Sequence, residues 1–221
     1  MICQLLFLKG FKDSNIYFQQ MAKAERLYGM KNRLLFLFLL SILLFTISGA
    51  YGIGTAHIST QLIEVSSSVF EWNKAFFVIG RLIVGLLYPA IILLLPSLIF
   101  WLLGKVTLQK LVAMQSFVLI ILLIESGLHT LLAIFAGLEW YSSPFSLGVI
   151  AQYITTNDLL IYFCGSISLF KLWSMILQYK GLRAFTTQKG WVLWGVILFV
   201  NSLFWILTAF LAYIDFHVLL F

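Results

Sequence analysis

Three ionisable residues lie inside apolar stretches that are long enough to cross a membrane. Glu125 and His129 are four residues apart in Glu-Ser-Gly-Leu-His, so a helix places them on one face, where they can hydrogen-bond to each other. Lys171 lies in the stretch Leu-Phe-Lys-Leu-Trp. An ionisable group in lipid costs about 2.5–3.5 kcal/mol or more unless it is paired or hydrated. Each of the three is therefore a candidate functional residue.

Two interpretations of the Glu125 and His129 pair are open. The pair can relay protons or bind a cation, or it can be a polar clamp between helices, which Ser126 and Gly127 would help by allowing close approach. Lys171 can extend its ammonium to the outer interface or pair with Glu125. No third His or Cys accompanies the pair in a neighbouring span, so the sequence predicts no metal site there and no cofactor.

The composition indicates that a membrane-embedded bundle holds these residues. Of the 221 residues, 62% are apolar and 10% are charged, whereas a soluble domain has about 25% charged residues. A soluble fold cannot cover so many apolar side chains, so we expect an all-α integral membrane protein. The net charge of +6 then reflects topology, and nucleic acid is not an expected partner.

Five stretches are apolar enough to cross a hydrocarbon layer about 30 Å thick, which takes about 20 helical residues. They are Leu34–Gly52, Leu82–Leu103, Leu111–Leu138, a less regular stretch within Leu159–Leu182, and Trp191–Tyr213. Pro89 and Pro96 are expected to kink the second. The predicted organisation is a cytoplasmic basic tail (1–33), a five-span membrane domain (34–213) and a short external C-terminus (214–221).

Basic residues are concentrated on alternate connections, which predicts the orientation. Those expected on the cytoplasmic side are Lys9, Lys12, Lys23, Arg26, Lys31, Arg33, Lys105, Lys110, Lys180, Arg183 and Lys189. The opposite side has Lys74 and Arg81 in the first connection. The N-terminus is therefore predicted to be cytoplasmic and the C-terminus external.

The connections and the tail are themselves apolar in part. Residues 55–73 carry an apolar stripe at helical spacing and are expected to form an interfacial helix, and residues 142–158 are expected to re-enter or skim the interface. The tail resembles an amphipathic segment on anionic lipid, and partner docking is the alternative. Its candidate contact residues are Lys23, Arg26, Lys31 and Arg33.

Motifs of membrane enzymes do not occur in the sequence. It has no His-Glu-x-x-His, no paired aspartates in a span, no Gly-x-Ser-x-Gly and no Gly-x-x-x-x-Gly-Lys. The spans also have no row of polar residues that could line an aqueous pore. Cys3 and Cys164 stand alone, so neither a disulfide nor a zinc site is predicted. The sequence thus predicts neither an enzyme nor a channel.

The layout resembles the Yip (Ypt-interacting protein) domain family. In that family the fourth span opens with an Asp-Leu-Phe-x-x-Trp-like run and closes with Gly-Leu before a short basic loop. The matching residues are Leu169, Phe170, Trp173, Gly181 and Leu182, while Ser168 stands where Asp is common. The resemblance covers about residues 34–213. The chain has neither the longer tail nor the Asp-Leu-Tyr-Gly-Pro-like signature of eukaryotic members, so it is similar to the bacterial type.

The resemblance implies a non-catalytic protein of the bacterial plasma membrane. Such a protein would be an accessory or scaffold for other membrane proteins, for example an export or peptide-resistance transporter, or would organise the membrane. Its expected partners are the lipid bilayer and membrane proteins, with a homo-oligomer as a further option. The alternative is a small secondary or proton-coupled transporter that uses Glu125 and His129.

Overall fold

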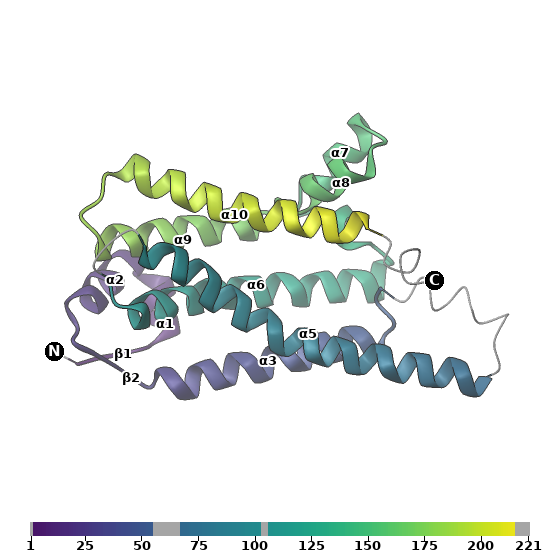
Figure 1. Cartoon of the computed structure of the whole chain (residues 1–221), viewed down its shortest axis with the longest axis horizontal. Coiled ribbons are helices and arrows are strands. Elements are labelled where there is room, and N and C mark those ends of the chain that lie inside the picture. The colour runs from purple at the N-terminus through teal and green to yellow at the C-terminus, as the bar shows by residue number, and fades with distance from the viewer. Residues whose placement is uncertain (1, 55–66, 103–105, 215–221) are drawn as a thin grey trace.

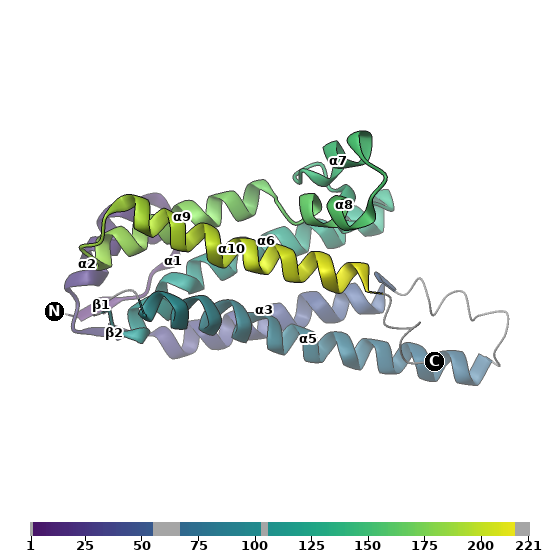
Figure 2. The same ribbon diagram turned by 45° about the horizontal axis from the view of Figure 1, so that its top comes forward.

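A bundle of long helices makes up the computed structural model, which describes residues 2–54, 67–102 and 106–214. The helices that run along its long axis are α3 (Met30–Ala50), α5 (Ser67–Trp101), α6 (Leu108–Ala136), α9 (Leu169–Phe185) and α10 (Gly190–Tyr213). Short elements of the N-terminal segment lie at one end, and α7 and α8 lie near the other (Figures 1 and 2).

Four helices are long and apolar enough to cross a membrane, and they confirm four of the expected spans. These helices are α3, α5, α6 and α10. Helix α9 corresponds to the predicted fourth span, but it has only 17 residues, or about 25 Å, and contains Lys171 and Lys180. The membrane character of α9 therefore stays a prediction.

Helix α5 begins well before the apolar stretch that predicted it. It starts at Ser67, so residues 67–73 belong to this helix and not to a separate interfacial one. Residues 55–66 of the expected interfacial helix lie outside the described residues. Arg81, expected in a connection, also lies within α5, which continues through Pro89 and Pro96. The backbone hydrogen bonds of a helix continue where its side chains become polar. Hydropathy alone therefore placed the start of this helix too late in the chain.

Helix α6 lies at the centre of the bundle. Every residue from Leu111 to Leu119 is buried, whereas a helix facing lipid on one side would expose a stripe. Helices α3, α5 and α9 and the N-terminal segment all pack against it. Of the functional candidates further along α6, Glu125 is buried and His129 is half-buried.

The N-terminal segment is part of this core. Its elements are β1 (Ile2–Gln4), α1 (Phe7–Lys12), α2 (Ser14–Lys23) and β2 (Arg26–Tyr28), and the two strands pair in parallel. Leu5, Phe18 and Met21 are fully buried. We expected the apolar face of this segment to lie on lipid. Instead, α1 and α2 turn this face toward the end of the bundle, where α6 and α9 cover it.

The opposite end holds three short elements before α9. They are η2 (Trp140–Ser142), α7 (Gly148–Ile154) and α8 (Asp158–Gly165). The Leu147 N–H donates to the Ile167 carbonyl and the Leu169 N–H to the Phe145 carbonyl, both at 3.0 Å. Helix α8 packs on α10. A break at residues 166–168 then separates α8 from α9.

Candidate functional site

Glu125 and His129 lie on one side of α6, as their spacing predicted. Glu125 is 4% exposed and His129 is half-buried. In the part of the chain that the structure describes, Glu125 Oε1 and His129 Nε2 are both buried without a hydrogen-bond partner. A buried polar atom without a partner loses its hydration and gains nothing in return. These two atoms are therefore polar groups that the described residues leave unsatisfied.

Two neighbouring helices add groups to this site. Tyr88 of α5 and Lys171 of α9 both interact electrostatically with Glu125, as does His129. His129, Lys171 and Tyr88 thus lie within electrostatic range of Glu125. A carboxyl, an imidazole, a phenol and an ammonium are all groups that can gain or lose a proton.

Lys171 is held at the break between α8 and α9. Its Nζ donates to the Ser166 carbonyl at 2.7 Å, and its own N–H donates to the Ser168 Oγ at 3.2 Å. The side chain is half-buried and makes no ion pair with a described carboxylate. The broken helix therefore supplies the carbonyl that binds the ammonium, while its charge still acts on Glu125.

A chain of amide side chains joins α6, α9 and α10 closer to the N-terminal segment. Gln178 Nε2 donates to Gln115 Oε1 at 3.3 Å, and Asn201 Nδ2 donates to Gln178 Oε1 at 2.9 Å. Ser174 lies between Gln178 and Lys171 on α9, and its Oγ donates to the Lys171 carbonyl at 2.7 Å. Gln178 and Asn201 were not singled out from the sequence, although an amide within an apolar stretch is a signal for an interhelical contact.

Arg81 forms a second polar feature, half-buried between α3 and α5. Its guanidinium donates to Ser48 Oγ at 2.6 Å and lies 5.6 Å from the Phe45 ring centre and 5.9 Å from that of Phe77. Among the described residues, its Nε has no hydrogen-bond partner. Gly49 makes room for this side chain, because an added Cβ would lie 3.0 Å from Arg81 Cβ.

The candidate tail residues lie at the other end of the bundle from α7 and α8. Lys23, Arg26 and Lys31 are exposed, whereas Arg33 is half-buried with its guanidinium 5.4 Å from the Phe7 ring centre. Among the described residues, no group of three or more His, Cys, Asp or Glu could hold a metal ion. The tail cations are thus a surface feature that is separate from the buried site on α6.

Comparisons with protein-family models, with curated proteins and with solved structures found no match. A functional conclusion therefore depends on the geometry of the residues themselves.

Proposed function

We propose that the chain is a five-span membrane protein that works as a small proton-coupled transporter, with Glu125 and His129 binding a proton or a small cation. The observation that carries this proposal is the pair of unpartnered buried atoms, Glu125 Oε1 and His129 Nε2, on one side of the central helix. Ionisable groups in the interior of a membrane bundle are expensive to keep, which favours a role for them.

The course of the chain supports a fifth span. Helices α6 and α10 run in the same direction along the bundle, so the chain must return between them (Figures 1 and 2). Helix α9 makes that return, packed against both. Five crossings place the termini on opposite sides. The cations of the N-terminal segment favour the cytoplasm for that end.

The charge of Lys171 supports proton exchange at Glu125. A carboxylate alone in a buried site is strongly disfavoured, so a nearby cation is needed when the proton leaves. The Lys171 ammonium supplies this charge while the Ser166 carbonyl holds it. Transporters often bind their ion where a helix is interrupted. The break at residues 166–168 suits alternating access, because the backbone there can change conformation while the bundle stays folded.

Proton flux into liposomes tests this function. With a pH gradient imposed across the membrane and a dye reporting internal pH, Glu125→Gln and His129→Ala should each lower the protein-dependent flux at least tenfold. The matched control is Glu139→Gln, which removes an exposed carboxylate just after α6 and should leave the flux unchanged. Flux that Glu125→Gln does not alter, or no flux with any gradient or cation, would contradict the proposal.

A second candidate function is the accessory role that the Yip-type resemblance implies, and the exposed cations favour it. Lys23, Arg26 and Lys31 remain exposed although the apolar face of their segment is buried, which leaves a charged surface for an acidic partner. Purification in mild detergent should then recover a stoichiometric membrane protein, which changing all three to glutamine should release. Changing the exposed Lys9 and Lys12 to glutamine is the control, and recovery of a homo-oligomer alone would contradict this role.

A further inference from the structure

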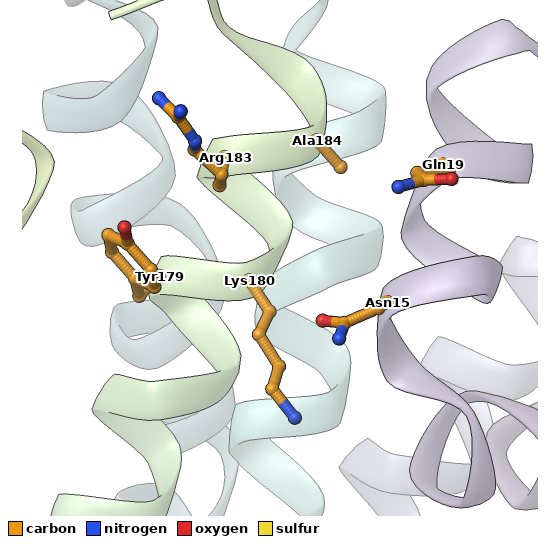
Figure 3. Close-up of a pocket in the computed structure, with 6 residues that line it drawn as sticks. All are labelled: Asn15, Gln19, Tyr179, Lys180, Arg183 and Ala184. Atoms are coloured by element: carbon orange, nitrogen blue, oxygen red, sulfur yellow. The ribbon is translucent and has the colours of Figure 1, made fainter. Parts of the chain in front are cut away.

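A pocket opens between α2 and α9 at the end where the N-terminal segment packs (Figure 3). Its volume is about 280 Å³. Two amides from α2 face the C-terminal half of α9, which contributes a phenol and two cations. The lining residues are Asn15, Gln19, Tyr179, Lys180, Arg183 and Ala184.

The cations of this pocket are held by neutral groups. Lys180 Nζ donates to Ser14 Oγ at 3.1 Å, and Arg183 Nη1 donates to the Gln188 carbonyl at 3.0 Å. No carboxylate is among the residues that line the pocket. Two positive charges beside amide donors form a surface that attracts an anion, and both cation types bind phosphate oxygens well.

Aromatic residues beside the pocket are of the kinds that collect at the level of lipid headgroups. Tyr179, in the pocket wall, stacks on Trp194 with ring centres 4.9 Å apart and planes 17° apart. Trp191, near the start of α10, is 75% exposed. Tryptophan and tyrosine collect at membrane interfaces, where their rings contact lipid and their polar atoms reach water.

The two walls are held together by the core beneath them. The Phe18 ring of α2 lies 6.1 Å from the Phe185 ring of α9, in an edge-to-face contact. Phe18 is fully buried, and the same helix contributes the Ser14 hydroxyl, whose oxygen accepts the hydrogen bond from Lys180. The pocket is therefore formed before any ligand arrives, which lowers the entropic cost of binding.

We propose that this pocket binds a phosphate group, supplied by the headgroup of an anionic phospholipid in the leaflet on this side. The phosphate would contact Lys180 from α9 and the amides of Asn15 and Gln19 from α2, while Arg183, whose guanidinium points away from α2 in Figure 3, adds positive charge to the lining. A lipid bound in this way joins the N-terminal segment to the bundle. This site is independent of Glu125 and of any transport activity.

Binding of a short-chain phosphatidylglycerol to the detergent-purified protein tests the proposal. The wild type should bind it saturably, and changing Lys180 and Arg183 to glutamine should weaken binding at least tenfold. Changing Lys9 and Lys12 to glutamine removes two exposed charges from the same end and should alter binding less than twofold. Equal weakening by both pairs would mean diffuse attraction and would overturn the pocket, as would the absence of saturable binding.

Two further measurements test whether binding occurs in this pocket and whether the ligand is a lipid. Changing the exposed Asn15 and Gln19 to alanine should also weaken binding without disturbing the Lys180 to Ser14 contact, which guards against misfolding of the lysine variant. Inorganic phosphate distinguishes the source of the ligand. Weak binding of phosphate beside tight binding of the lipid supports a headgroup, whereas equal binding of both overturns the lipid assignment in favour of a soluble phosphate.

Discussion

Replacing Phe117 with alanine should release the N-terminal segment from the bundle. The Phe117 ring is fully buried in α6 and contacts the rings of Phe7, Phe11, Tyr17 and Phe18, with centres 5.3–5.6 Å apart. Truncating a buried phenylalanine costs about 3–5 kcal/mol, since both the apolar transfer and the packing are lost. We expect that loss to fall on the contact between the segment and α6.

Limited proteolysis measures this release. Trypsin should cleave the segment at its exposed basic residues about a hundredfold faster in the variant, because cleavage follows the population of the open form. Phe135→Ala is the matched control, since Phe135 lies on the same helix and is 83% exposed. Equal cleavage of the two variants would mean that Phe117 does not hold the segment.

Replacing Gly148 with valine should disrupt the end of the bundle that holds α7 and α8. An added Cβ would collide with the Tyr141 carbonyl oxygen and would lie 2.8 Å from Gly165 Cα. The obstructing atoms are backbone, so they cannot turn aside as a side chain can. The cost should therefore reach or exceed the upper end of the usual 1–3 kcal/mol for overpacking.

Thermal unfolding in detergent, with hydrogen exchange at residues 140–165, tests this expectation. The variant should unfold at lower temperature and exchange faster in that segment. Gly195→Val is the control, because an added Cβ at Gly195 in α10 meets nothing within 4 Å. It should shift stability by less than about 1 kcal/mol, since valine is a slightly better helix former than glycine. Equal destabilisation by both changes would refute the steric argument.

The long helices were predictable because membrane crossing imposes a length and a composition that one sequence displays directly. Burial of the N-terminal segment was not predictable. Phe18 and Met21 would be equally suitable against lipid or against α6, and hydropathy does not distinguish the two surroundings. The position of Arg81 was misassigned for a related reason, since a polar residue marks the end of an apolar stretch but not the end of a helix.

Some residues of the candidate site could likewise be predicted from the sequence, and others could not. Glu125 and His129 could be paired from sequence because helical spacing alone puts them on one face. Tyr88 could not, because its approach to Glu125 depends on how α5 packs against α6. Gln115 and Gln178 meet only because α9 runs alongside α6, and a sequence separation of 63 residues gives no hint of this.

The burial of the N-terminal segment has a consequence for biosynthesis. Met21 leaves the ribosome about 160 residues before Leu182, which belongs to the same apolar core. At about 5–20 residues per second, that interval lasts roughly 8–30 s. During this time the apolar face of α2 lacks α9 and, for more than half of the interval, also Phe117 of α6, so the membrane surface is the nearest apolar phase. We therefore expect the nascent segment to wait on the bilayer as an interfacial helix and to join the core only after α9 has been made.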